Sequence, residues 1–445
     1  MPVLPLSRAP LLSAVVPVLV AHWPDAIPRL LFGRSFPAFQ QLRCSPSPSC
    51  GSPLCLLQLL FTPVCGVRMW DMEPEERRRV SGSLGSSQKT ADETSTPESP
   101  ACNDSCSNPA HAGVRKEGML MGELEALVQE MVTASSWWER HGLDWFILFL
   151  NFLALPLGFL CLRSQSTLVF VLGIIILGMV HHTFTVKGSH LASHGALSES
   201  KHWSRFWVLF FVEVCTSFTA EQATHGHVKL HHGYTNVVGL GDSSTWKVPI
   251  LNRYVYMFFA PLMLPVITPL VALGLLRKEE PRIALRTLCL MSLGLFSHYW
   301  LLIKVSGFQS PGFALLCMLI TRGLLALPYI HINIFQHIGL PMFSLDKKPP
   351  RIHMMSLGVL NLPRNPILDW TFGHSLISCH VEHHLFPRLS DNMCLKVKPV
   401  VSKFLQRNHL PYNEDSYLSR LWLFLSRYEE LMVHAPPITD LVGLQ

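Results

Sequence analysis

The stretch HVEHHLFP, residues 380–387, places three histidines within five positions of a chain that is otherwise rich in apolar residues. His380, His383 and His384 have the spacing i, i+3, i+4, so in a helix their imidazoles would lie on one face, where they could bind a common metal ion. A single cluster of this kind can arise by chance. Its meaning therefore depends on whether other parts of the chain supply partners.

Two further stretches repeat the pattern. HLASH begins at residue 190 and HVKLHH at residue 227, and both have helical spacing. Packing alone gives no reason for triple clusters at such spacing, so we interpret them as metal ligands; HLASH taken alone favours neither a metal site nor a structural role. The additional histidines are His190, His194, His227, His231 and His232.

Eight imidazoles exceed the needs of one ion and suggest two. NIFQH adds Asn333 and His337 at i, i+4, although this pair alone is better explained as a helix cap or a buried polar pair. Imidazole-rich ligation suits zinc, copper or iron. The residues themselves do not choose among these metals.

The composition places this histidine-rich region in a membrane protein. Hydrophobic residues make up 49% of the 445 residues and charged residues only 15%, below the usual charged share of about 25%. The net charge of +6 suits an anionic membrane surface. No basic stripe accompanies it, so we expect no nucleic-acid partner.

Four apolar segments have lengths suited to crossing a bilayer: 145–162, 168–180 with an extension to 186, 254–276 and 287–303. We expect two hairpins, the first closed by RSQST and the second by RKEEPRIALR. Both hairpins would then return every histidine cluster to one side of the membrane.

Two other apolar segments, 206–220 and 313–330, carry Glu213 and Arg322. We expect them to be interfacial or buried helices rather than spans. The loop charges are ambiguous under the positive-inside rule, because the expected tip of the second hairpin is itself basic.

The remaining segments predict the domain organisation. Residues 1–71 form an uncertain N-terminal extension, and 72–121 are rich in Ser, Thr, Pro and charge, which favours a disordered linker. An amphipathic helix with apolar residues at 124, 127, 128 and 131 opens the main domain, 122–430, and Trp137 and Trp138 follow it as interfacial anchors. Residues 431–445 form a C-terminal tail.

Taken together, HLASH, HVKLHHGYTN and HVEHHLFP resemble the three histidine boxes of the membrane fatty acid desaturase family, over about residues 122–430. The resemblance implies an all-α integral membrane protein with four transmembrane helices and a cytosolic helical cap that carries a di-metal histidine site. It implies two ferrous ions, O2 as co-substrate and residence in the endoplasmic reticulum. The implied ligands are His190, His194, His227, His231, His232, His337, His380, His383 and His384, with Asn333 acting through a water molecule.

The resemblance also implies partners. The substrate would be an acyl-CoA or an acyl lipid in an apolar tunnel, and carboxylates beside the imidazoles would orient them; candidates are Glu221, Asp242 and Glu382. The sequence contains no HPGG motif, and its third box begins with His380 where many relatives have Gln. We therefore expect a separate cytochrome b5 and its reductase as electron donors. Leu191 replaces an Asp that many relatives carry in the first box.

Other activities are compatible with the same boxes. A related di-iron lipid hydroxylase would use identical ligands, and its product would be an alcohol rather than an alkene. A catalytically silent membrane scaffold that binds lipid could retain its metal for structure. A zinc-dependent lipid hydrolase fits less well, because such di-zinc sites usually include bridging carboxylates.

Overall fold

The structure, a computed structural model, describes residues 109–238, 240 and 252–431. The expected N-terminal extension, residues 72–108 and all but the first residue of the expected tail lie outside this part of the chain. Helix α5 (Pro109–Thr133) begins inside the segment that was expected to be a disordered linker. Leu124 and Val128 are buried as the helical pattern predicts, whereas Leu127 is 42% exposed.

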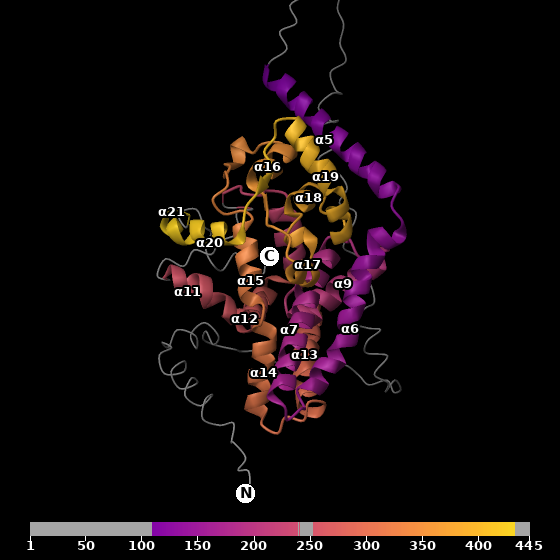
Figure 1. Cartoon of the computed structure of the whole chain (residues 1–445), viewed down its shortest axis with the longest axis vertical. Helices are drawn as coiled ribbons and strands as arrows, with labels where there is room; N and C mark the ends of the chain where they lie inside the picture. Colours follow the sequence, from indigo (N-terminus) through magenta and orange to yellow (C-terminus); the bar gives the residue numbers. More distant parts are fainter. Residues whose placement is uncertain (1–108, 239, 241–251, 432–445) are drawn as a thin grey trace, which may run out of the picture. The chain divides into compact units, whose positions relative to one another are not determined.

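The centre of the fold is a bundle of four apolar helices, which run lengthwise through the lower part of Figure 1. Contacts join α6 to α7, α7 to α14 and α14 to α13. The helices are α6 (Leu143–Cys161), α7 (Thr167–His182), α13 (Pro281–Lys304) and α14 (Pro311–Gly323).

The links of both hairpins lie at the same end of this bundle. The Ser306 hydroxyl, between α13 and α14, donates a hydrogen bond of 2.8 Å to the carbonyl oxygen of Phe159 in α6. Phe170 near the start of α7 has its ring centroid 6.3 Å from that of Phe308. The hairpins are therefore α6–α7 and α13–α14, and both return to the opposite end.

The segment 254–276, expected to pair with 287–303, is divided among several short helices. That segment forms α11 (Arg253–Phe258), η5 (Ala260–Met263), α12 (Leu264–Leu275) and η6 (Leu276–Lys278). Arg253 at its start donates to the carbonyl oxygen of Leu425, and Glu279 just after it accepts a hydrogen bond from Gln222. Because both partners belong to the histidine-bearing end, this segment leaves that end and returns to it.

Within the part of the chain that the structure describes, five helical segments are long and apolar enough to cross a membrane: Trp138–Cys161, Thr167–Ser193, Ala260–Lys278, Pro281–Lys304 and Pro311–Phe335. The last contains the segment 313–330, which was expected to be an interfacial or buried helix. A charge argued against a span, but Arg322 is buried against protein and does not face outward.

Irregular helices and short helices complete the histidine-bearing end, which we call the cap. π-Helical turns extend several of its helices: η1 (Trp138–Gly142), η2 (Thr183–Gly188), η3 (Leu209–Thr216) and η4 (Thr224–His231). The remaining helices are α8 (Ser189–Ser193), α9 (Lys201–Val208), α10 (Ala220–Ala223), α15 (Ala326–Phe335), η7 (Leu345–Lys347), α16 (Arg351–Gly358), α17 (Pro366–Phe372), η8 (His374–Leu376), α18 (His380–Leu385), α19 (Asp391–Arg407), α20 (Tyr417–Ser426) and α21 (Tyr428–Leu431). Strands β1 (Leu360–Asn361) and β2 (Asn413–Glu414) pair in parallel.

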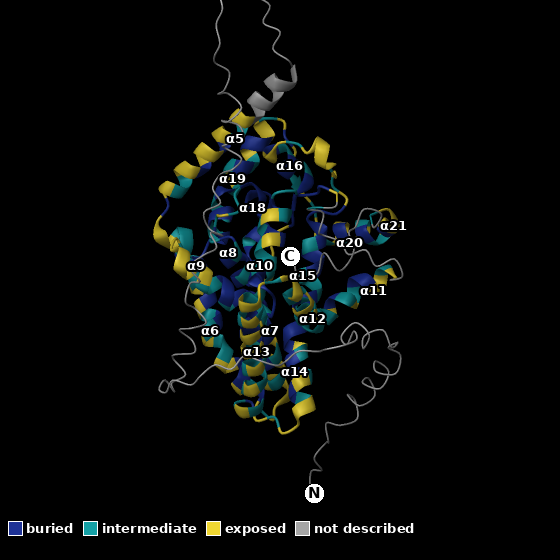
Figure 2. Cartoon of the chain, turned by 180° about the vertical axis from the view of Figure 1, so that it is seen from behind, coloured by how far each residue is buried: buried dark blue, intermediate teal, exposed yellow. Residues whose placement is uncertain are grey.

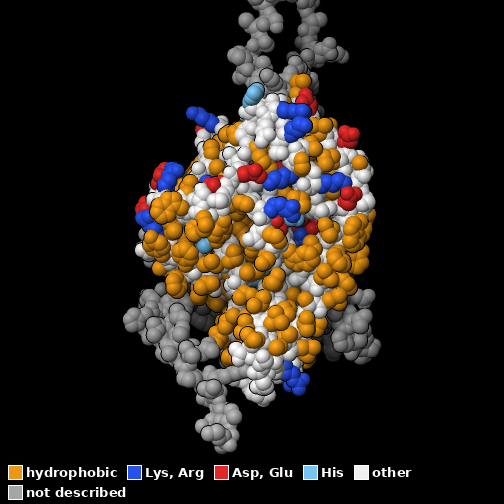
Figure 3. Space-filling view, in the orientation of Figure 1, with side chains coloured by type: hydrophobic (Ala, Val, Ile, Leu, Met, Phe, Trp, Pro, Cys, Tyr) orange, Lys and Arg blue, Asp and Glu red, His pale blue; other side chains and the backbone are white. Residues whose placement is uncertain are grey.

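The two ends differ in surface chemistry. Hydrophobic side chains cover the lower part of the face shown in Figure 3, over the bundle, and charged side chains gather above them, over the cap. In Figure 2, buried residues collect around α18, α8 and α10, whereas α13 and α14 carry many exposed positions. Exposed leucines on the bundle include Leu153, Leu157 and Leu293. Such a surface suits contact with lipid.

Candidate metal centre

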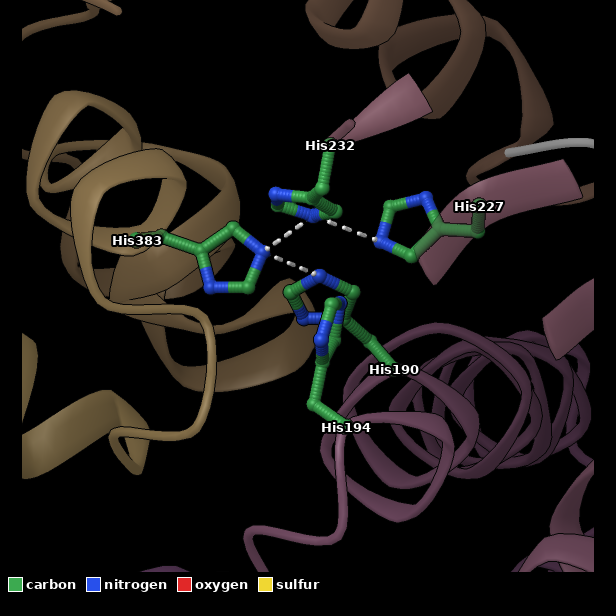
Figure 4. Close-up of side chains that lie close together, drawn as sticks. All are labelled: His190, His194, His227, His232 and His383. Atoms are coloured by element: carbon green, nitrogen blue, oxygen red, sulfur yellow. Dashed lines mark hydrogen bonds between the residues drawn. The ribbon is translucent and has the colours of Figure 1, made fainter. Parts of the chain in front are cut away.

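Five histidines from all three boxes form the first group, shown in Figure 4. Their rings point from different segments into one space, and one ring nitrogen of each lies within 4.8 Å of those of the others. The Nε2 atom of His383 lies 3.0 Å from the Nε2 atoms of both His190 and His232. The members are His190, His194, His227, His232 and His383, all buried.

Four further histidines form the second group under the same distance limit: His231, His337, His380 and His384. The Nε2 atoms of His337 and His380 are 2.9 Å apart. The groups adjoin, because the ring centroids of His232 and His384 are 4.2 Å apart. The structure thus brings together all nine histidines that the sequence singled out.

The second and third boxes divide between the groups, which corrects the expectation that each box serves one ion from one face. His227 and His231 lie in the π-helical turn η4. In a π-helix residues five apart are bonded neighbours, so His227 and His232 share the first group while His231 turns to the second. In α18, His380 and His384 face the second group and His383 faces the first.

Backbone contacts fix two of these imidazoles in a metal-binding form. The Nδ1 atom of His337 lies 3.1 Å from the carbonyl oxygen of Gly358, and that of His380 lies 2.9 Å from the carbonyl oxygen of Ser375. A carbonyl oxygen only accepts hydrogen bonds, so each Nδ1 carries the proton and each Nε2 presents a lone pair. Two lone pairs 2.9 Å apart repel each other unless a cation lies between them.

A metal ion fits this arrangement. Two imidazole nitrogens at about 2.1 Å from one ion and at right angles to each other are about 3.0 Å apart. Other nitrogens also lack partners: the Nε2 atoms of His194 and His384 are buried without a hydrogen bond. These histidine groups therefore fit a di-metal site.

Burial and mutual repulsion keep several of the grouped histidines neutral. Burial lowers the pKa of His380 to about 3, although its bond to the Ser375 backbone opposes this. Burial, followed by neighbouring imidazoles, lowers the pKa of His232, His383 and His384 well below the usual value. Neutral imidazole is the form that binds metals.

A buried ion network orients His190. Its Nδ1 lies 3.2 Å from the hydroxyl oxygen of Ser375, and that hydroxyl donates its proton to Asp391. Asp391 also pairs with Lys187, which lies 2.8 Å from the carboxylate of Asp144. Burial alone would raise the pKa of Asp391, but Lys187 and Ser375 hold it below its usual value.

Two of the three carboxylates predicted to orient imidazoles are engaged elsewhere. Glu221 pairs with Arg286 at 2.7 Å. Glu382 is buried, which raises its pKa, and it accepts hydrogen bonds of 2.7 Å from Tyr412 and 3.1 Å from Asn361. Asp242 lies outside the described residues. Asp391 was missed, because no spacing in the sequence links it to a box.

Asn333 lines the cavity beside the first group, which also reaches His190 and His227. Its side-chain amide donates to the carbonyl oxygen of Tyr329 at 3.0 Å.

An apolar helical bundle that carries a di-metal histidine site at one end defines a class of multi-pass membrane protein. Comparison with known sequences gives the family. The family described as Fatty acid desaturase matches residues 165–416. The chain is 77% identical over 326 residues to fatty acid desaturase 6 of Bos taurus, which covers 73% of this chain and 95% of that protein.

The human protein of the same name is 73% identical over 73% of this chain and 91% of its own length. A more distant relative, the Delta(5) fatty acid desaturase fat-4 of Caenorhabditis elegans, is 25% identical over 25% of each chain. The chain therefore belongs to the fatty acid desaturase family and is an oxidoreductase of the desaturase type.

Proposed function

We propose that this protein inserts a carbon–carbon double bond into a fatty acyl chain, with O2 as co-substrate and two electrons per turnover, at two ferrous ions held by the nine histidines. One observation carries the proposal: the Nε2 atoms of His337 and His380 lie 2.9 Å apart, each with its lone pair toward the other, within a buried set of imidazoles. Iron held there would supply the oxidising power needed to remove hydrogen from an unactivated CH2–CH2 unit.

Residues of this chain would divide the remaining work. The two groups would each hold one ion: the first of five histidines, the second of four, with Asn333 contributing through a water molecule. Asp391 would orient His190 through the Ser375 hydroxyl, since such outer contacts fix the tautomer of a ligand. Burial of the groups would keep competing water from the reacting carbon atoms.

Four spans and a cytosolic cap form the second part of the proposal. Because 253–278 leaves the cap and returns to it, α6, α7, α13 and α14 with their extensions would cross the membrane. The basic residues between α12 and the first turns of α13, among them Arg277, Lys278 and Arg286, then lie on the cap side, and Arg163 and Lys304 lie near the far end. The positive-inside rule favours a cytosolic cap for this arrangement.

The partners follow from the family. An acyl-CoA or acyl lipid of the endoplasmic reticulum membrane would be the substrate, and a separate cytochrome b5 with its reductase would deliver the electrons. The family resemblance supports this part of the proposal.

Cellular lipid profiling with double-bond localisation tests the activity. Cells that express the intact chain are compared with cells that express a His383→Ala, His384→Ala variant, which removes one ligand from each group, at equal protein level. We expect an unsaturated acyl species that only the intact chain produces. Hydroxylated acyl products instead would identify a lipid hydroxylase, and identical profiles with both proteins folded in the membrane would contradict catalysis and favour a scaffold.

A further inference from the structure

A cavity of about 120 Å3 runs from the first histidine group toward the bundle. A single water molecule needs only about 10–15 Å3, so the cavity has room for part of a ligand. Apolar residues such as Val212, Leu264 and Ile330 line it, as an acyl chain requires. Its lining also includes several polar side chains, which a cavity built only for hydrocarbon would not need: His181, His182, Thr185, Thr216 and Arg322.

Arg322 is the feature that decides what the cavity can hold. The residue is 6% exposed, lies near the end of α14 and lines the cavity. Its hydrogen bonds all leave from Nη2, at 3.1 Å to the Ser217 hydroxyl and 3.4 Å to the carbonyl oxygens of Cys215 and Thr216. Its Nε is buried without a partner.

The charge of Arg322 has no carboxylate counterpart among the residues that the structure describes. Two other cations with little exposure are compensated: Lys187 pairs with Asp144 and Asp391, and Arg286 pairs with two glutamates. A buried guanidinium without an anion is costly, and its fork of donors matches the two oxygens of a carboxylate.

We propose that this cavity binds an acyl chain that ends in a carboxylate, and that Arg322 holds the carboxylate. The proposal deepens the proposed function and takes the acyl nature of the ligand from it. The carboxylate has two sources: the acid group of an unesterified fatty acid, or an acid group at the far end of a chain whose first carbon is esterified.

The bonds of Arg322 to the end of η3 also allow a purely structural role, so the test must separate the two. The Arg322→Gln variant removes the charge, and Ser217→Ala removes one structural contact while it leaves the guanidinium in place. Arg407→Gln, at an exposed position on α19, is the matched control. Thermal unfolding and metal content are measured for every variant.

The experiment is equilibrium binding to the purified full chain in lipid nanodiscs, without electron donors. The probes are hexadecanoate, methyl hexadecanoate, the coenzyme A thioester of hexadecanoic acid and the coenzyme A thioester of hexadecanedioic acid. We expect Arg322→Gln to lower the affinity for a probe that ends in a carboxylate by roughly tenfold or more, which is the range for loss of a charge-assisted hydrogen bond. Probes without a terminal carboxylate should bind the variant and the intact chain equally.

Each outcome decides the question. If Arg322→Gln loses affinity for hexadecanoate alone, the ligand is an unesterified fatty acid. If it loses affinity for the coenzyme A thioester of hexadecanedioic acid alone, the ligand carries its carboxylate at the far end of an esterified chain. The proposal is overturned if Ser217→Ala loses as much affinity as Arg322→Gln. It is also overturned if Arg322→Gln binds every probe as tightly as the intact chain does.

If Arg322→Gln does not fold, the intact chain still gives the answer. It must bind hexadecanoate or the dioic thioester at least tenfold tighter than the matched neutral-ended probe, and equal affinities would refute the idea. Double-bond formation without this preference would sink the inference and leave the proposed function standing. Preference for a carboxylate without any double-bond formation would support the inference and contradict the proposed function.

Discussion

Substitution of Asp391 by Asn tests how the chain holds its first histidine group. Asp391 is 1% exposed, and it accepts hydrogen bonds from the Ser375 hydroxyl and from the Ser375 backbone N–H, the latter at 3.0 Å. It also pairs with the buried ammonium of Lys187. The amide keeps one acceptor oxygen but removes the charge, so two effects follow together.

The first effect is on stability. Loss of one partner from a buried ion pair costs about 3–5 kcal/mol. Asp144 remains 2.8 Å from the Lys187 ammonium, so we expect a value near the lower end of that range. The second effect is on metal affinity, because the Ser375 hydroxyl that orients His190 loses its anionic acceptor; outer contacts of this kind change affinity by about 10–100-fold.

A paired variant separates the two effects. Ser375→Ala removes the hydroxyl between Asp391 and His190 and leaves the ion pair of Lys187 intact. We expect it to lower ferrous ion affinity by a similar factor while the free energy of unfolding changes by less than in Asp391→Asn. Metal titration and thermal unfolding of both purified variants measure this. Unchanged metal affinity in both would refute the orienting role.

Three further predictions test the packing and the ion pairs of the fold. Leu124→Ala should lower the free energy of unfolding by about 2–5 kcal/mol, because this side chain is fully buried where α5 meets the cap. Leu127→Ala, at an exposed position of the same helix, should change it little. Chemical denaturation of both variants measures the difference. Gly294→Ala should reduce the yield of folded protein, since a Cβ atom there would lie 1.8 Å from the carbonyl oxygen of Val214. Gly274→Ala, with nothing within 4 Å of the added atom, should express normally. Arg286→Gln should destabilise the chain by about 3–5 kcal/mol, because it leaves the buried carboxylate of Glu213 without its counter-charge, and a wild-type melting temperature would contradict that.

The sequence predicted the helical class and the histidines that converge, because box spacing and apolar length are local properties. It did not predict how the apolar segments are arranged, for reasons visible in two segments. The uncharged run 254–276 satisfies every length criterion, yet its ends bond to the cap through Arg253 and Glu279. The run 313–330 carries Arg322, but a charge that faces a cavity does not oppose insertion in the way that a lipid-facing charge does.

The division of the histidines into groups was beyond sequence reasoning for a different reason. The spacing of His227, His231 and His232 fits an α-helical face, but the backbone there is π-helical, and one added residue per bonded turn changes which imidazoles meet. The role of Asp391 depends on tertiary contacts with Ser375 and Lys187, which are distant in sequence from one another.

The central claim is that the nine histidines hold two metal ions, and metal stoichiometry tests it most directly. The purified full chain is loaded with ferrous ion without oxygen, freed of loosely bound metal and analysed for iron per chain. We predict two ions per chain for the intact protein and fewer for His337→Ala, which removes a ligand of the second group only. One ion or none in the folded intact chain would contradict the account.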